Sequence, residues 1–220
     1  MNARKIIVGP HTVRNNGIRM AYRMWQDGFI PTMIYVPLRG GAGLGNIISE
    51  VFKLLAPEIP CMYCAVIAHS YQGFNSDAEV NIDGWTTAPE NIRPVDRVLL
   101  VDDIFDSGKS ANYLWSLILK SAKHPENFRL AVHDFKDFTY RPTLPKVPDY
   151  YAAYHKIERK EDDFWIHYSS HELYGLMPQE RETYYYNDDP ALRDVMEEIF
   201  RRHEQGDPQS PVNGNEVQAK

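Results

Sequence analysis

Apolar residues that favour β-structure are concentrated in four short runs, and this pattern predicts four buried strands. The runs are Thr32–Pro37, Met62–Ala68, Arg97–Val101 and Phe128–Phe135. Apolar residues at helical spacing follow the first and the third run, in Gly45–Leu55 and Ser110–Lys123. Strands that alternate with helices indicate an α/β fold, in which helices flank an open, mainly parallel sheet.

The character of the sequence changes after Asp137. Three prolines interrupt regular structure there, and two aromatic-rich stretches follow: Pro142, Pro145, Pro148, Tyr150–Tyr154 and Phe164–Tyr168. We expect a smaller, irregular cap over the sheet, followed by a helix at Asp189–His203. The prediction is one domain over residues 1–205, with its core at about 30–137 and the cap and C-terminal helix at about 138–205. Residues 206–220 are predicted to be a disordered tail.

The predicted sheet also indicates where a ligand would bind. In open parallel sheets, ligands bind beyond the carboxyl ends of the strands. That rule brings together the segments that follow the predicted strands: Leu38–Gly45, His69–Thr87, Asp102–Ser110 and the residues from Lys136 onward.

The composition narrows the class of partner. The 220 residues are 43% hydrophobic and carry a formal net charge of −6, which suits a globular domain and argues against nucleic acid as a partner. We expect small-molecule partners whose negative charge is met locally, by backbone N–H groups and a metal ion. No stretch is long and apolar enough for a signal peptide or a membrane span, so we expect a cytoplasmic protein with no membrane partner.

The two cysteines, Cys61 and Cys64, form a Cys-x-x-Cys pair at the start of a predicted strand. A zinc site would need a second pair of ligands at usable spacing, and positions i and i+3 of a strand face opposite sides. We therefore expect buried structural thiols rather than a redox or zinc site.

The segment Asp102–Ser110 carries the strongest chemical signal. Two adjacent acids, Asp102 and Asp103, end an apolar strand, and the loop Asp106–Ser110 leads into a helix. That loop offers successive backbone N–H groups, a glycine, two hydroxyls and the positive end of the helix, which together suit a phosphate. Its Gly-Lys-Ser does not complete a nucleoside-triphosphate P-loop, because that motif needs a glycine where Asp103 stands.

The same segment resembles the 5-phosphoribosyl-1-diphosphate binding motif of the type I phosphoribosyltransferases. Every position fits the family pattern of four apolar residues, two acids, two apolar residues and Asp-Ser/Thr-Gly-x-Ser/Thr. The resemblance implies that Asp102 and Asp103 hold the ribose hydroxyls and bind Mg²⁺. It further implies that Asp106 contacts the sugar phosphate and accepts the proton of the reaction. The 5-phosphate would then be bound by Ser107, Gly108, Lys109 and Ser110.

Two other segments resemble family elements that contact the diphosphate. The first follows a predicted strand and is similar to the short diphosphate loop, whose backbone amides face the ligand; it consists of Leu38, Arg39, Gly40 and Gly41. The second, Ser70 and Tyr71, resembles the mobile lid of the purine enzymes. Both are expected to bind 5-phosphoribosyl-1-diphosphate.

The expected base pocket rests on three residues. Lys136 ends the fourth predicted strand, where hypoxanthine–guanine and xanthine–guanine enzymes carry a lysine that reads the 6-oxo group of the purine. Trp165 and Ile166 match their aromatic–aliphatic pair, whose ring stacks on the base. Where family members place a metal-site aspartate, this chain has His171 and Glu172, and Glu172 is the candidate third metal ligand beside Asp102 and Asp103.

The resemblance is closest to the hypoxanthine/xanthine-guanine phosphoribosyltransferases of purine salvage. It implies a Mg²⁺-dependent, homo-oligomeric enzyme that transfers the phosphoribosyl group to a 6-oxopurine, giving a nucleoside monophosphate and diphosphate. Three alternatives stay open: another base such as orotate, uracil or adenine, a non-purine amine acceptor, and a regulator that senses the sugar diphosphate without turnover. Lys136 and Trp165 favour the purine, and Asp106 favours an enzyme.

Overall fold

The computed structural model describes residues 4–70, 80–121 and 124–205. By internal packing the chain divides into two compact units, Met1–His171 and Glu172–Lys220. The predicted tail at 206–220 lies outside the described residues. In the part of the chain that is described, no helix has the length and apolar character needed to cross a membrane.

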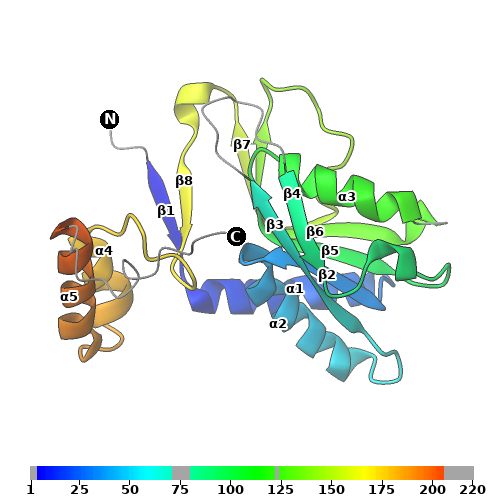
Figure 1. Ribbon diagram of the computed structural model, residues 1–220, viewed down its shortest axis with the longest axis horizontal. Helices are drawn as coiled ribbons and strands as arrows, with labels where there is room; N and C mark the ends of the chain where they lie inside the picture. The colour runs from blue at the N-terminus through cyan, green and yellow to red at the C-terminus, as the bar shows by residue number, and fades with distance from the viewer. Residues whose placement is uncertain (1–3, 71–79, 122–123, 206–220) are drawn as a thin grey trace, which may run out of the picture. The chain divides into compact units, whose positions relative to one another are not determined.

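A six-stranded sheet forms the centre of the first unit (Figure 1). Neighbouring strands are parallel except for the antiparallel pair β3–β4, which confirms the predicted open, mainly parallel sheet. Its order is β4 (Val80–Trp85), β3 (Met62–Ser70), β2 (Met33–Leu38), β5 (Val98–Phe105), β6 (Phe128–Phe138) and β7 (Tyr150–Ile157). The four predicted strands are β2, β3, β5 and β6, and all four run beyond their predicted C-terminal ends.

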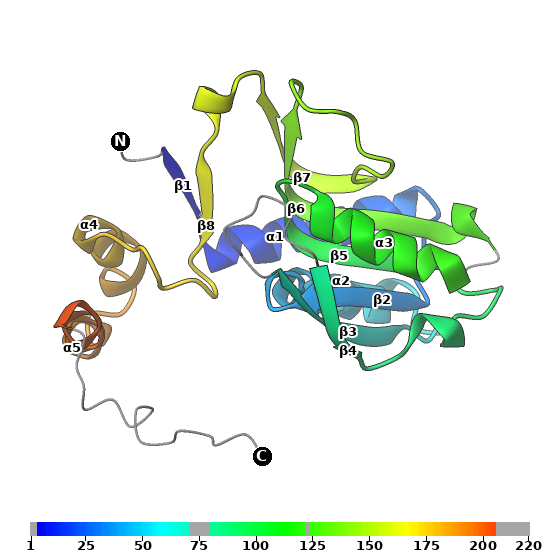
Figure 2. The same cartoon turned by 45° about the horizontal axis from the view of Figure 1, so that its top comes forward.

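Helices cover both faces of this sheet (Figure 2). α1 (Pro10–Gln26) and α2 (Gly40–Leu55) pack on one face, and α3 (Lys109–Ser121) packs on the other. Each face has its own apolar core, because the buried strands carry apolar side chains on both sides. α1 was not predicted, although Pro10 stands in its first turn and five of its residues are buried at helical spacing: Val13, Gly17, Met20, Ala21 and Met24.

The region after Asp137 is more regular than the predicted cap. Residues 139–149, which include all three prolines, form turns and irregular structure. β7 then returns to the main sheet, so this part of the predicted cap is a sheet strand. It escaped prediction because its aromatic-rich start follows three prolines, a pattern that favours an irregular cap. As an edge strand, β7 buries only its first and last residues, Tyr150 and Ile157.

A separate two-stranded sheet completes the first unit. β1 (Lys5–Val8) pairs in parallel with β8 (Trp165–Tyr168), so the two ends of this unit's chain lie side by side. Three short 3₁₀ turns occur among the connections: η1 (Pro89–Asn91), η2 (Pro125–Asn127) and η3 (Lys160–Asp162). Residues before and within β8 contact the main sheet: Asp163 and Phe164 bind Lys136 of β6, and Tyr168 binds Asp134 of the same strand.

The second unit contains only helical elements among its described residues. They are α4 (Pro178–Arg181), the wider helical turn η4 (Glu182–Tyr186) and α5 (Leu192–Gln205). Glu197 of α5 accepts a hydrogen bond from the Tyr186 hydroxyl at 2.7 Å and contacts Arg181 at 3.3 Å, which ties α5 to the preceding turns. The predicted C-terminal helix is therefore present, beginning three residues later than Asp189. One domain over residues 1–205 stays a prediction.

Candidate active site

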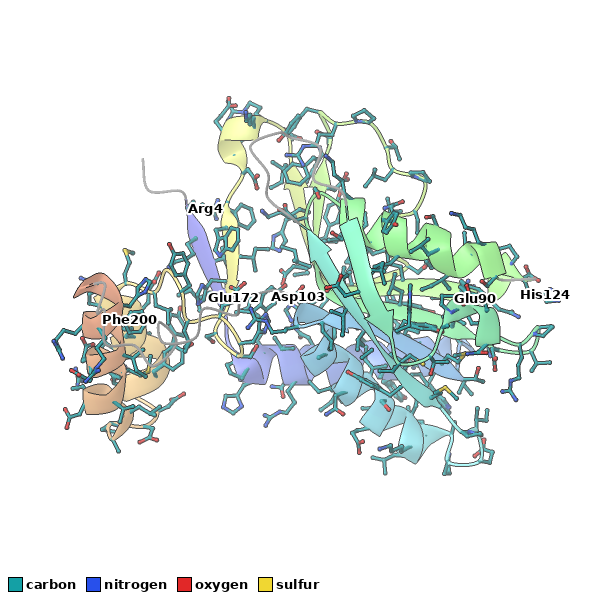
Figure 3. The ribbon with its side chains drawn as sticks, in the orientation of Figure 1. Arg4, Glu90, Asp103, His124, Glu172 and Phe200 are labelled. Atoms are coloured by element: carbon teal, nitrogen blue, oxygen red, sulfur yellow. The ribbon has the colours of Figure 1, made fainter. Side chains whose placement is uncertain are left out.

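The two adjacent acids lie inside β5, not after it, because the strand continues to Phe105. The Asp102 carboxylate accepts a hydrogen bond from the Asp103 backbone N–H at 2.9 Å, and the Asp103 carboxylate accepts one from the Ile104 N–H at 2.8 Å. The pKa of Asp102 is raised well above its ordinary value, because burial disfavours its charge and Asp103 adds a second negative charge beside it. Asp103, labelled in Figure 3, lies in the C-terminal half of β5, an interior strand of the main sheet.

The first turn of α2 packs closely against this acidic pair. Gly40 and Gly41 were predicted to be loop residues, but α2 already begins at Gly40, so they form the start of the helix. A Cβ atom on Gly41 would lie 2.3 Å from the backbone oxygen of Val101, so no larger residue fits there without moving β5. Leu38 and Arg39 precede this turn and are exposed, and the peptide bond between them is cis. The start of α2 lies beside Asp103, since a Cβ atom on Gly40 would be 2.5 Å from its carboxylate.

The predicted phosphate loop, Asp106–Ser110, connects β5 to α3. Asp106 and Ser107 are exposed, and Lys109 begins α3, so the loop ends at a helix N-terminus. Gly108 has a φ of +69°, and a Cβ there would lie 2.4 Å from Phe105 and from Leu144. The Asn112 amide secures the loop from behind, since its Nδ2 donates to the Gly108 oxygen at 3.0 Å. Backbone amides and hydroxyls are thereby held in a geometry suited to an anion.

Lys136 of β6 links the phosphate loop to the residues that precede β8. Its side chain is only 4% exposed, and its Nζ lies 3.2 Å from Asp106 Oδ1 and 2.9 Å from Asp163 Oδ1. The same ammonium donates to the backbone oxygen of Phe164 at 2.5 Å and lies 5.1 Å from the centre of that residue's ring. Although β6 extends to Phe138, the Lys136 side chain is directed toward Asp106.

The two other residues predicted for the base pocket are placed differently from each other. The Trp165 side chain is 56% exposed, while Ile166 is buried in the apolar core. Trp165 pairs with Lys5 in the small sheet, and its backbone N–H donates to the Arg4 oxygen at 2.9 Å. The exposed indole of Trp165 can stack on a ligand. The side chain of Ile166 is buried, so this residue could contact a ligand only through its backbone.

Sequence reasoning missed several polar residues at this site. Asp163 and Phe164, which hold the Lys136 ammonium, immediately precede the predicted Trp165. His133 and Asp134 are both 2% exposed and interrupt the apolar run of β6. Polar residues inside a buried strand are costly unless they are paired, so this interruption was a usable signal.

Some predicted residues are not placed with the others. Tyr71 lies outside the described residues, and Ser70 is the last residue of β3, with its side chain not described. Glu172 begins the second unit, so its role as a metal ligand stays a prediction. The two thiols are free, with Cys64 buried, and burial raises the pKa of Cys61 to about 12, consistent with unreactive structural cysteines.

The acidic pair suits a magnesium ion that is shared with a ligand. Among the described residues, no three or more His, Cys, Asp or Glu side chains gather into a metal cluster. Mg²⁺ seldom uses an all-protein cage and is usually held by one or two carboxylates, waters and substrate phosphates. Asp102 and Asp103 supply such carboxylates, and the unfavourable proximity of their charges would be relieved by a cation.

Comparisons with known proteins agree with this geometry. A family model described as the phosphoribosyl transferase domain matches residues 11–170. The fold is similar to a purine phosphoribosyltransferase from Pyrococcus horikoshii, with a TM-score of 0.57 and 20% identity over 79% of this chain and 98% of that one. It is also similar to a hypothetical protein from Neisseria gonorrhoeae with bound ppGpp, with a TM-score of 0.54 and 16% identity over 79% of this chain and 92% of that one.

A hypoxanthine phosphoribosyltransferase from Staphylococcus aureus gives a TM-score of 0.50 and 15% identity over 70% of this chain and 79% of that one. No curated protein sequence matches the chain. At these identities the solved structures establish the fold, while the family model covers most of the chain. The chain therefore belongs to the phosphoribosyl transferase domain family and is a transferase enzyme.

Proposed function

We propose that this enzyme transfers the phosphoribosyl group from 5-phosphoribosyl-1-diphosphate to a 6-oxopurine, giving a nucleoside monophosphate and diphosphate. The observation that carries the proposal is the 3.2 Å contact between Asp106, in the phosphate loop, and the buried Lys136. Asp106, which would contact the sugar phosphate, and Lys136, which would bind the carbonyl group of the base, are thereby close enough to contact one bound substrate pair.

The sugar-phosphate side supports specific roles. Asp102 and Asp103 accept hydrogen bonds from the ribose hydroxyls, and they would hold Mg²⁺ together with oxygens of the substrate. The loop residues Ser107, Gly108, Lys109 and Ser110 bind the 5-phosphate through backbone amides, hydroxyls and the start of α3. The first turn of α2, with Leu38 and Arg39 before it, offers amides and one positive charge to the diphosphate.

The reaction breaks the bond between C1 of the sugar and the diphosphate and forms a bond to a ring nitrogen of the base. Positive charge grows on the sugar and negative charge on the leaving diphosphate, and bound Mg²⁺ would offset the latter charge. Asp106 is half-exposed at the mouth of the loop, where its carboxylate can accept the proton that the base nitrogen loses. Ser70 and Tyr71 would close over the site and exclude water.

Lys136 supports a 6-oxopurine as the acceptor. Its three N–H groups already meet three oxygen atoms, from Asp106, Asp163 and Phe164. A carbonyl oxygen at purine position 6 can replace one of these acceptors, whereas the amino group of adenine brings another donor. The exposed ring of Trp165 would stack on the base. Cytoplasmic location and homo-oligomeric assembly remain predictions from the sequence.

The test is a panel of acceptors. Enzyme, 5-phosphoribosyl-1-diphosphate and Mg²⁺ are incubated with hypoxanthine, guanine, xanthine, adenine, orotate or uracil, and diphosphate release is measured. At least one 6-oxopurine should be used, with adenine slower by about 10²-fold or more, because its amino group would bring a second donor to the Lys136 ammonium in place of an acceptor. Efficient use of adenine or orotate, with the 6-oxopurines inert, would reject this assignment of the base.

A lysine pair sharpens the same experiment. Lys136→Met should lower turnover and narrow the difference between 6-oxopurines and adenine, because the buried ammonium is lost. The control is Lys156→Met in β7, where the lysine is exposed and pairs with Glu158. Release of diphosphate with no base of the panel, despite tight binding of the sugar diphosphate, would favour the sensing regulator or an unusual acceptor instead.

A further inference from the structure

A buried polar network lies directly behind the acidic pair, and the reaction outlined above does not use it. Its centre is Asp134 of β6, whose two carboxylate oxygens have three partners. Oδ1 is 2.6 Å from His155 Nε2, and Oδ2 is 2.6 Å from both His133 Nδ1 and the Tyr168 hydroxyl. On its outer side, His133 Nε2 lies 3.0 Å from the Asn16 amide of α1. The network thus joins α1, β6, β7 and β8.

Burying the Asp134 carboxylate costs free energy of folding, so hydrogen bonds have to compensate for it. A carboxylate that is 2% exposed loses its hydration and destabilises the fold unless hydrogen bonds replace the water. Burial alone would raise the pKa of Asp134, but the hydrogen bonds from His133, His155 and Tyr168 outweigh it and lower the pKa. Asp134 is therefore a charged, fully engaged acceptor, and each of its partners is held in a defined position.

The network reaches the candidate site at Tyr168 of β8. The Tyr168 hydroxyl, 2.6 Å from Asp134, is also 2.8 Å from the backbone oxygen of Asp103. A hydroxyl has one hydrogen, which here lies between a carboxylate and a carbonyl oxygen, so the tyrosine oxygen is fixed from both sides. Tyr168 is also stacked on His171, with ring centres 5.6 Å apart, and His171 Nε2 lies 3.3 Å from Asp103 Oδ2.

Asp103 has little room to move at this point. Its carboxylate bonds to the N–H of the next residue, Ile104, so the direction of the side chain follows the backbone that Tyr168 contacts. The start of α2 is close as well, because a Cβ atom on Gly40 would lie 2.5 Å from the Asp103 carboxylate. A shift of the Asp103 backbone by a few tenths of an ångström would therefore change how the carboxylate meets a ligand beside α2.

We propose that Tyr168, oriented by Asp134, is a positioning residue that sets the Asp103 carboxylate for binding of the magnesium complex of the sugar diphosphate. The inference rests on the proposed function and adds to it a pair of residues in the small sheet and β6. Tyr168 acts through Asp103 and touches no substrate. Removal of the Tyr168 hydroxyl should accordingly weaken binding of the sugar diphosphate and leave binding of the base unchanged.

The experiment compares two tyrosines that are equally buried. Tyr168→Phe removes the hydroxyl that contacts Asp103, and Tyr35→Phe removes a hydroxyl that donates to the Thr87 backbone oxygen at 3.1 Å. Tyr35 is fully buried in β2, and both variants lose a contact from a buried hydroxyl to a backbone oxygen. Tyr168→Phe also loses the contact to the Asp134 carboxylate, which belongs to the network under test. Tyr168→Phe should raise KM for 5-phosphoribosyl-1-diphosphate about 10-fold, the lower end for removal of a residue that orients a metal ligand. KM for the base should not change, and Tyr35→Phe should leave both constants as in the wild type.

Binding without turnover gives a second readout. Calorimetric titration with 5-phosphoribosyl-1-diphosphate and Mg²⁺ should show the same weakening in Tyr168→Phe. Asp134→Asn, which keeps the shape of the side chain and removes its charge, should weaken binding too, and the double variant should be no worse than the more affected single variant. That lack of additivity is expected when two residues act through one contact.

The outcomes separate this inference from the function on which it rests. If the wild type binds and uses the sugar diphosphate but Tyr168→Phe behaves like Tyr35→Phe, the positioning role is wrong and the function stands. Equal changes in both KM values would likewise reject it. If the wild type binds the sugar diphosphate but uses no base, the proposed function fails. The calorimetric titration of Tyr168→Phe against Tyr35→Phe still decides whether Tyr168 has the positioning role. A wild type that does not bind it at all overturns both the proposed function and the inference.

Discussion

The sugar-phosphate side and the base side of the candidate site are built in different ways. The first comes largely from one continuous segment, in which β5 passes through the phosphate loop into α3, and its Asp106 side chain is 49% exposed. The second is assembled around Lys136, 4% exposed, with partners from the phosphate loop and from the residues before β8. One side presents exposed groups of a loop and a helix start to a ligand, and the other presents buried groups that already bind each other.

This difference has a consequence for binding. An anion that enters the phosphate loop meets amides and hydroxyls already in position, so little has to change. A base that reaches Lys136 has to take the place of an oxygen atom that the ammonium already binds. Affinity for the sugar phosphate should therefore be less sensitive to single substitutions than discrimination between bases, except at residues where the two sides meet.

Asp106 is such a residue, and its substitution should have the largest effect. Asp106→Asn keeps the size of the side chain and removes both the proton acceptor and the negative partner of Lys136. We expect kcat to fall about 10²–10⁴-fold, the usual range for loss of a general base, with little change in binding of the sugar diphosphate. Steady-state kinetics and calorimetric titration measure the two quantities separately.

The control for this variant is Asp27→Asn. Asp27 caps the C-terminal end of α1 and lies 4.0 Å from the exposed Arg23, so its loss should leave both quantities unchanged. Near-normal turnover in Asp106→Asn would remove Asp106 from the chemistry. A loss of sugar-diphosphate binding as large as the loss of turnover would instead make it a binding residue only.

Two glycines of α2 test how closely the sugar-phosphate side is packed. Gly41→Ala would place a Cβ 2.3 Å from the Val101 oxygen, while Gly43→Ala, in the same turn of the helix, meets no atom within 4 Å. The first should destabilise the protein by about 1–3 kcal/mol, as overpacking does, and should weaken binding of the sugar diphosphate. The second should stabilise it by up to about 1 kcal/mol, since alanine favours a helix more than glycine does.

Denaturant unfolding measures both changes in stability, and the opposite signs make the comparison robust. If Gly41→Ala were as stable as Gly43→Ala, the close approach of α2 to β5 would be wrong. The acidic pair and the diphosphate amides would then not share one site.

The sequence predicted one side of the site better than the other for the same physical reason. A phosphate loop consists of neighbouring residues, so its strand, acids, glycine and helix start are all visible in one window, Val98–Ser110. The partners of Lys136 lie 27 and 30 positions away in the chain, and only the fold brings them together. Spacing along a sequence carries no information about such pairs.

The same reasoning explains the errors in the fold. The buried strands of the sheet interior were found, whereas the edge strands β4 and β7 and the two strands of the small sheet were not. The strands of the small sheet are only four residues long, and β7 buries only its first and last residues. The buried Asp134 network was overlooked because polar residues in a strand were not treated as a sign of internal pairing. Gly40 and Gly41 were assigned to a loop because the segment follows a strand and resembles the family's diphosphate loop. In the structure α2 already begins at Gly40, and Gly41 packs closely against β5.

The smallest predicted effect concerns the stability of the unliganded protein and compares two acids. The pKa of Asp102 is raised by burial and by the charge of Asp103, so its ionised form destabilises the fold as pH rises above the ordinary aspartate value. The pKa of Asp96, which is 3% exposed, is lowered by hydrogen bonds from Arg93. The ionised form of Asp96 therefore stabilises the fold above that value, and this contribution is lost as pH falls through the lowered pKa.

Asparagine at each position should reveal the opposite signs. At pH 7, Asp102→Asn should stabilise the protein by about 1 kcal/mol, a rise in Tm of about 2–4 °C, while weakening binding of the magnesium–sugar-diphosphate complex. Its Oδ1 can still accept the hydrogen bond from the Asp103 N–H. Asp96→Asn should lower Tm, because the hydrogen bonds from Arg93 lose their charged acceptor. Thermal unfolding of both variants without ligand decides the matter. A lower Tm for Asp102→Asn would mean that the acidic pair is stabilising by itself and is not held ready for a cation.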